Sequence, residues 1–247
     1  TIDLVDPFGA LNARKKADHK SYPIVRPGTK LVNLSMGDLG VKAWAHNFHR
    51  TQRFDLNLNG DSAIALPQLA KFCRELIEKD DTARKRIQQR FERVKEEHIK
   101  LRASFKETAN QRWANTPISL PRLATEIWEA TRDRNIVITA GNLNGWTRRV
   151  MDLDKPNQYL GVSGGGGLGY QYGASLGAAL AYRGTDVFPI NIQSDGDLLF
   201  TPSALWTAAH HRIPFLTVVF NNRSYFNSEE HAMEVARDRN RPLERAP

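Results

Sequence analysis

The stretch VFPINIQSDGDLLF, residues 187–200, joins an apolar run to two acids that stand on either side of a glycine. The run 187–192 has the length and composition of a buried β-strand. Asp195 and Asp197 follow it on a glycine hinge, ahead of a further helical segment. Two interpretations fit this pattern: a turn with a helix cap, or a loop that holds a charged ligand.

Strand-like and helix-like segments alternate around this stretch. We expect strands at 136–140, 187–193 and 215–220, and helices from Ser119, over 169–182 and over 201–211, with Thr201 as the N-cap of the last. Apolar strands that alternate with helices predict a buried parallel sheet flanked by helices. The expected fold class is therefore α/β, with part of a second α/β domain ahead of this sheet.

The chain divides into three expected parts. Residues 1–80 carry strand-like runs and a helix, which predict part of a central α/β domain. Residues 81–116 form a connecting amphipathic helix, because apolar residues recur there at helical spacing. Residues 117–247 form the domain that contains the sheet. The chain lacks an initiating Met and has no clear C-terminal endpoint, so we expect a fragment or a processed subunit.

Charge and composition limit the function classes. The net charge is +8, but the basic residues of 84–106 alternate with glutamates on a helix, which is typical of a solvated face. We therefore expect no nucleic-acid partner, although a basic surface suits anionic small molecules. No apolar stretch approaches the roughly 20 residues needed to span a bilayer. The single Cys73 excludes an intrachain disulfide, fits a reducing cytoplasm and is expected to pack in a core.

Polar residues follow two of the expected strands where each strand ends. Asp195 follows the strand at 187–193, and Asn222 closes the Asn-Asn pair after the strand at 215–220. Ligands of open parallel sheets bind beyond the carboxyl ends of the strands, and neighbouring strands lie about 4.8 Å apart. If these strands are neighbours, Asp195 and Asn222 meet at the sheet edge. Carboxylate, amide and carbonyl oxygens form the kind of site that Mg²⁺ prefers.

The spacing of these residues resembles a known motif. An Asp-Gly pair with an asparagine 27 residues after the acid, the second of two, resembles the motif of thiamine-diphosphate-dependent enzymes. The resemblance implies that Asp195, Asn222 and Ser224, the last through its carbonyl, hold Mg²⁺. Asp61 also neighbours a glycine, but the residue 27 positions later is Gln88, so the spacing discriminates. The family usually has glycine where this chain has Ser194.

Three further stretches carry the same resemblance. GGGGLGYQYGASLGAALAYRG, residues 164–184, is similar to the loop under the cofactor's thiazolium ring, which implies that Leu168 supports the reactive V-shape. TAGNLNGW, residues 139–146, implies a diphosphate contact through Asn142 or Asn144. SALWTAAHHRIP, residues 203–214, resembles the acetolactate synthase and benzoylformate decarboxylase branch. The expected cofactor-binding residues are Asn142, Asn144, Gly167, Leu168, Gly169, Gly196, Asp197, Leu198, Asn222, Ser224 and Tyr225.

The resemblance implies Mg²⁺-dependent thiamine diphosphate chemistry, in which the cofactor accepts electrons while a C–C bond beside a carbonyl is cleaved or formed. The expected substrate is a 2-oxo acid, a 2-hydroxy ketone or an acyl thioester, and the enzyme a lyase or transferase. In the family, a glutamate from a separate pyrimidine-binding domain activates the cofactor. We find no such domain here and expect it from another chain or a missing segment. Sites of this family lie between subunits, so an oligomer is expected, with no membrane partner.

A serine hydrolase is a competing interpretation. Residues 161–165 satisfy G-x-S-x-G, and Ser163, Asp195 and His210 or His211 follow the chain order of an α/β-hydrolase. The motif requires a strand that runs directly into the serine, and the preceding residues predict a poor one.

A dinucleotide enzyme and a non-catalytic subunit also stay open as interpretations. Gly164, Gly166 and Gly169 satisfy the dinucleotide-binding pattern G-x-G-x-x-G, but four consecutive glycines produce such matches easily. A non-catalytic subunit would bind the cofactor for assembly alone. Two roles stay open for the aromatic residues, lining a pocket or ordinary packing, and the sequence favours neither for Tyr170, Tyr172, Tyr225 and Phe226.

Overall fold

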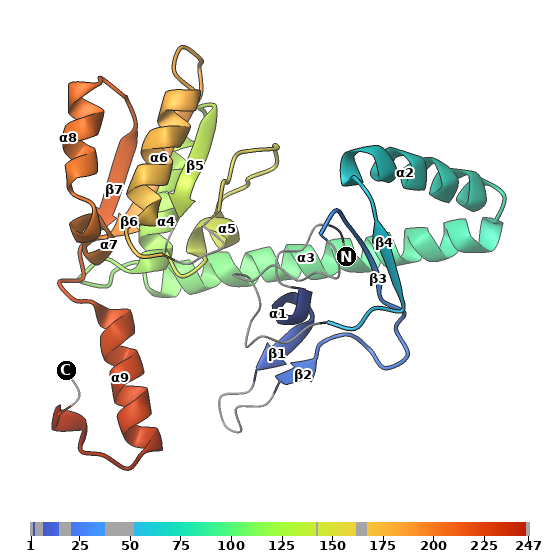
Figure 1. Ribbon diagram of the computed structural model, residues 1–247, viewed down its shortest axis with the longest axis horizontal. Helices are drawn as coiled ribbons and strands as arrows, with labels where there is room; N and C mark the ends of the chain where they lie inside the picture. Colours follow the sequence, from blue (N-terminus) through green and yellow to red (C-terminus); the bar gives the residue numbers. More distant parts are fainter. Residues whose placement is uncertain are drawn as a thin grey trace. The chain divides into compact units, whose positions relative to one another are not determined.

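The computed structural model describes residues 2, 7–14, 21–37, 52–141, 143–161 and 167–245. The chain forms two compact units, Thr1–Glu96 and Glu97–Pro247 (Figure 1). The 31-residue helix α3 (Asp81–Gln111) contains the boundary between them. Within the described ranges, no helix combines the length and the apolar character needed to cross a membrane.

The first unit contains two small sheets. Its elements are α1 (Pro7–Leu11), β1 (Asn12–Arg14), β2 (Ser21–Pro23), β3 (Val32–Ser35), β4 (Leu56–Asn59) and α2 (Ser62–Glu78). β1 pairs antiparallel with β2, whereas β3 pairs parallel with β4. Asp61 caps α2 by accepting a hydrogen bond from the Ala63 amide at 2.8 Å. A parallel pair followed by a helix agrees with the α/β class expected here.

The helices of the first unit leave apolar side chains open. None of the residues of α2 is buried by a described part of the chain, and Cys73 is exposed. The expectation that Cys73 packs in a core is therefore wrong, because α2 has no described layer over it. On α3, Phe91 and Val94 are both more than half exposed, so helical periodicity predicts the apolar stripe but not its burial.

The second unit is built on a parallel sheet of three strands in the order β5-β6-β7, which confirms the predicted α/β class. The strands are β5 (Ile136–Gly141), β6 (Phe188–Ser194) and β7 (Leu216–Phe220). The helices are α4 (Leu120–Thr131), α5 (Trp146–Val150), α6 (Tyr170–Ala181), α7 (Asp195–Phe200), α8 (Ser203–His210) and α9 (Phe226–Asp238), with a short 3-10 helix at Leu243–Arg245. Figure 1 shows α6 and α8 alongside the strands.

The two faces of this sheet differ in chemistry. On one face, isoleucines of β5 and β6 pack against α4 and α5 to form the core, as Ile136, Ile138, Ile190 and Ile192 do. On the other face, β6 carries Asn191 and Gln193, both 0% exposed, and no described residue bonds to either carboxamide. Thr139 Oγ1 donates to Ser175 Oγ on α6 at 2.7 Å. Hydrogen bonds therefore contribute to the attachment of α6.

The structure has a helix, α8, within the expected range 201–211, and a short helix that was not expected, α7, precedes it. α7 begins at Asp195, directly after β6, because Ser194 caps it by accepting a hydrogen bond from the Asp197 amide at 3.3 Å. α8 begins at Ser203, with Pro202 rather than Thr201 at the N-cap position. The predicted Thr201 cap is therefore wrong, since Thr201 ends α7 instead.

Candidate functional site

Asp195 lies where the ends of β6 and β7 meet. The two strands are parallel neighbours, with Ser194 opposite Phe220, which meets the condition under which Asp195 and Asn222 were expected to lie at one sheet edge. The turn 221–225 after β7 therefore comes beside the start of α7. The main-chain amide of Arg223 donates to Asp195 Oδ2 at 3.1 Å, so this carboxylate joins two strand ends.

The second carboxylate oxygen of Asp195 has no hydrogen-bond partner among the described residues. Oδ1 is buried, and no described residue donates a hydrogen bond to it. A buried carboxylate oxygen without a donor is costly, so a cation at this position would stabilise it. Asn222 and Ser224 lie on the adjacent turn, where Asn222 Oδ1 accepts from the Ser224 amide at 3.1 Å. Asp195 and this turn thus supply the oxygen types that Mg²⁺ binds.

The described residues hold no metal site made only of acids, histidines and cysteines. Within the described ranges, no group of three or more such side chains is placed to hold an ion. A site that combines one carboxylate with amide and main-chain oxygens is consistent with that finding.

Asp197 faces the protein interior. It is 8% exposed, and Gln171 Nε2 of α6 donates to its Oδ2 at 3.5 Å. Ser194 Oγ also donates to this oxygen, at 3.4 Å. Asp197 therefore links α7 to α6. Gln171 is not among the residues that the sequence predicts for the site; its signal is a long polar side chain in the first turn of a helix of small residues.

Three segments meet around the start of α7. A Cβ added to Gly196 would lie 3.0 Å from two ring atoms of Tyr225, so the turn after β7 packs directly on α7. The Tyr225 ring meets Phe200 edge to face, with 5.9 Å between centroids. Thr201 Oγ1 donates to the carbonyl of Gly169 at 3.1 Å, which joins α7 to the start of α6. The expected site residues Gly169, Gly196 and Tyr225 are thus brought together.

The remaining expected cofactor residues are less closely connected. Leu168 is 66% exposed beside Gly169, Gly167 is exposed, and Leu198 is half-buried. Asn144 is exposed after β5, and no hydrogen bond in the described part of the chain joins it to α7. Asn142 lies outside the described residues.

Gly169→Ala is expected to lower the free energy of unfolding by about 1–3 kcal/mol. Gly169 has φ +78°, and an added Cβ would lie 2.7 Å from Phe200 Cβ. The matched control is Gly173→Ala, because nothing comes within 4 Å of a Cβ added there. Alanine favours helix by about 1 kcal/mol over glycine, so the control should be neutral or stabilising. Urea unfolding of both variants tests this, and equal losses would contradict it.

The described residues give a serine hydrolase no geometric support. Ser163 lies outside them, and Tyr159, shortly before it, forms only an isolated bridge with Ile138. His210 stacks on Trp206, with 4.5 Å between ring centroids. Among the described groups, no hydrogen bond joins Asp195 to an imidazole.

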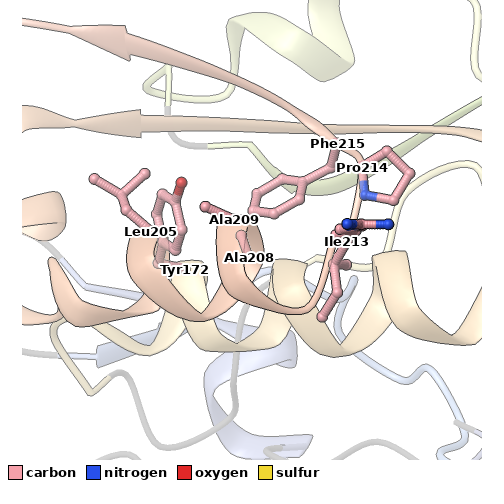
Figure 2. Close-up of a pocket in the computed structure, with 8 residues that line it drawn as sticks. Tyr172, Leu205, Ala208, Ala209, Ile213, Pro214 and Phe215 are labelled. Carbon is pink, nitrogen blue, oxygen red and sulfur yellow. The ribbon is translucent and has the colours of Figure 1, made fainter.

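A pocket of about 460 Å³ lies away from this cluster, between α6, α8 and the segment that leads into β7. Its lining residues are Tyr172, Leu205, Ala208, Ala209, Arg212, Ile213, Pro214 and Phe215. Figure 2 shows the Tyr172 and Phe215 rings among the aliphatic side chains of α8, and the two rings meet edge to face at 5.5 Å. Because 212–215 precede β7, part of the pocket lining lies at the amino end of that strand, whereas Asp195 follows a carboxyl end.

Comparison with known proteins identifies the second unit. The family model for the C-terminal thiamine pyrophosphate-binding domain of thiamine pyrophosphate enzymes matches residues 139–243. Acetolactate synthase 2, chloroplastic, from Brassica napus is 28% identical over 105 residues, which cover 42% of this chain and 16% of that protein. Benzoylformate decarboxylase from Pseudomonas aeruginosa is 34% identical over 108 residues, covering 42% of this chain and 20% of that protein.

A longer match extends the relationship toward the N-terminus. A protein from Methanococcus aeolicus named "Probable acetolactate synthase large subunit" is 25% identical over 179 residues, 69% of this chain and 28% of that protein. The chain thus spans less than a third of each of these relatives. The family match includes Asp195, the turn after β7 and the start of α6. Residues 139–243 are therefore similar to the C-terminal cofactor-binding domain of the thiamine pyrophosphate enzyme family.

Proposed function

We propose that this chain binds thiamine diphosphate through Mg²⁺ at the Asp195 turn and serves an enzyme that cleaves or forms a C–C bond beside a carbonyl. The observation that carries this proposal is the buried Oδ1 of Asp195, to which no described residue donates a hydrogen bond, in a region that matches the cofactor-binding domain of this family. Relatives named acetolactate synthase and benzoylformate decarboxylase support the reaction class. The proposed substrate class is a 2-oxo acid, a 2-hydroxy ketone or an acyl thioester.

Each part of the proposed site has a separate task. Asp195, Asn222 and the carbonyl of Ser224 would hold Mg²⁺. When bound, thiamine diphosphate supplies an electron sink for the carbonyl chemistry. Asp197 and Gln171 fix the position of α7 through the hydrogen bond between them. In this proposal residues 117–247 are the diphosphate-binding domain, 81–116 the connection and 1–80 part of the central domain.

An exposed apolar surface beside the site supports the proposal that another domain completes the enzyme. Five large apolar side chains there are each at least 50% exposed: Leu168, Leu199, Phe200, Tyr225 and Phe226. Clustered exposed apolar residues mark interaction sites. We propose that a pyrimidine-binding domain, from another chain or another segment, covers them in an oligomer.

The direct test is a binding titration with and without the metal. Thiamine diphosphate should bind the protein in the presence of Mg²⁺, and EDTA should remove that binding. Thiamine, which lacks the diphosphate, should bind far more weakly under both conditions. Tight binding of thiamine diphosphate in EDTA would contradict the metal assignment.

In an assembly completed by a pyrimidine-binding domain, Leu168→Ala is expected to lower turnover more than cofactor affinity. In the proposed role Leu168 supports the shape of the bound cofactor, so its loss should weaken binding by only about 1–3 kcal/mol. The side chain is 66% exposed, so its truncation should not disturb the fold. Leu180→Ala, at 49% exposure near the C-terminal end of α6, is the matched control and should keep turnover per bound cofactor. The assignment fails if Leu168→Ala loses affinity strongly but keeps normal turnover per bound cofactor.

A further inference from the structure

Two arginines of α5 direct their guanidinium groups toward one glycine. A Cβ added to Gly145 would lie 3.8 Å from Nη2 of Arg148 and 4.0 Å from Nη2 of Arg149. Both nitrogens are therefore within reach of one small anion placed over Gly145, where there is no side chain. Two guanidinium groups that converge in this way match the geometry of phosphate and carboxylate recognition.

No acid in the described part of the chain balances the positive charges of these two arginines. Within the ranges that the structure describes, no carboxylate forms an ion pair with Arg148 or Arg149. The neighbouring Arg102, by contrast, pairs with Asp152 while it donates to the carbonyl of Arg149 at 2.5 Å. Two converging, unbalanced cations repel each other, so an anion between them would remove that repulsion.

Aromatic rings hold both guanidinium groups in place. The Arg149 group lies over Trp146 at 5.0 Å and over Phe105 at 5.6 Å from the ring centroids. The Arg148 group lies over Tyr159 at 5.9 Å. Stacking of this kind favours the cation and limits its rotamers, so less entropy is lost when a ligand binds. The pair is thus arranged for binding before a ligand arrives.

The position of the pair suggests which molecules it can reach. Gly145 and α5 follow the carboxyl end of β5, and the strands of this sheet are parallel, so the pair and Asp195 belong to the same edge. We propose that Arg148 and Arg149 form an anion-binding site for a phosphoryl or carboxylate group. Two sources share this chemistry: the diphosphate of the cofactor, and the acidic group of a second small molecule. The site itself does not depend on the metal role proposed for Asp195.

Phosphate binding by the purified chain tests the proposal. Calorimetry at constant ionic strength should show saturable binding of inorganic phosphate to the wild type. The double variant Arg148→Gln, Arg149→Gln should lose at least tenfold in affinity. Arg134→Gln is the matched control, because its guanidinium also lies over a ring, that of Phe188 at 5.3 Å, but before the amino end of β5. This control should bind phosphate like the wild type.

A folding check and a single-arginine variant separate loss of the site from loss of the fold. Thermal unfolding would verify that each variant is folded, and Arg148→Gln alone serves if loss of the half-buried Arg149 destabilises the unit. No saturable binding by the wild type, or unchanged affinity in folded arginine variants, would overturn the proposal. Phosphate binding that is lost in Asp195→Ala but kept in the arginine variants would overturn it too.

The two sources are separated by titrations with thiamine diphosphate and thiamine in the presence of Mg²⁺. If the cofactor supplies the anion, the arginine variants should bind thiamine diphosphate at least tenfold more weakly and thiamine unchanged. If a second molecule supplies it, the variants should lose phosphate binding and keep thiamine diphosphate affinity. If the arginine pair binds phosphate but the chain does not bind thiamine diphosphate, the proposed function is refuted and the anion-binding site stands.

Discussion

Asp195→Ala is expected to abolish Mg²⁺-dependent binding of thiamine diphosphate and to leave the second unit folded. The substitution removes the buried oxygen that has no described partner and with it the only charged ligand proposed for the ion. Loss of residues that merely support metal ligands typically costs 10–100-fold, so loss of a ligand itself should cost about 100-fold or more. The turn keeps a partner, because Asn221 Oδ1 also accepts from the Arg223 amide, at 2.9 Å.

Calorimetry with thiamine diphosphate and Mg²⁺ measures this effect, and thermal unfolding verifies the fold. Asp186→Ala is the matched control, because it removes the same charge just before β6 instead of just after it. Asp186 accepts hydrogen bonds only from Asn135 Nδ2 among the described donors, at 3.2 Å. The control should bind the cofactor normally. Undiminished binding by Asp195→Ala would refute the metal site.

Residues 1–247 on their own are expected to show no lyase, decarboxylase or carboligase turnover, even with Mg²⁺ and thiamine diphosphate. In the proposed function, a carboxylate must serve the aminopyrimidine side of the cofactor. The acids that the structure places at the site are Asp195, assigned to the metal, and Asp197, which Gln171 and Ser194 hold toward the interior. Glu229 also lies there and accepts a hydrogen bond from Ser224 Oγ at 2.8 Å, so it too belongs to the metal side of the site. Proton transfer by a positioned side chain contributes about 10²–10⁴-fold to a rate, so its absence should be evident.

Product formation over a panel of 2-oxo acids, 2-hydroxy ketones and acyl thioesters measures this turnover. Addition of a pyrimidine-binding domain, in cis or in trans, should restore it on at least one substrate. Turnover by the chain alone would mean that one of its own acids serves as the relay. Normal cofactor binding without turnover in the completed assembly would favour a non-catalytic subunit.

Strand positions were predictable from the sequence because their signals are local. β5, β6 and β7 each lie within about two residues of the runs that apolar composition indicates, within the usual error of element boundaries. Their parallel pairing follows from the helices between them, and this brings Asp195 to the turn after β7. That part of the candidate site therefore followed from topology and spacing.

The features that were not predicted depend on competition between possible N-cap residues or on contacts between residues far apart in the sequence. Ser194 is as good an N-cap as Thr201, and because it comes first, α7 begins directly after the strand. The contact between Gln171 and Asp197 joins residues 26 positions apart, and no periodicity indicates it. Cys73 follows a helical apolar pattern, but the pattern cannot show whether another layer covers it.

The polar face of β6 has a consequence for how stability changes with temperature. Unfolding exposes Asn191 and Gln193 together with the isoleucines of the opposite face. Newly exposed apolar surface raises the heat capacity by about 0.45 cal/K/mol/Å², whereas polar surface lowers it by about 0.26. The second unit should therefore have a smaller heat-capacity change than a sheet with two apolar faces. Its stability curve should accordingly be flatter, so that cooling below the temperature of maximum stability weakens it less.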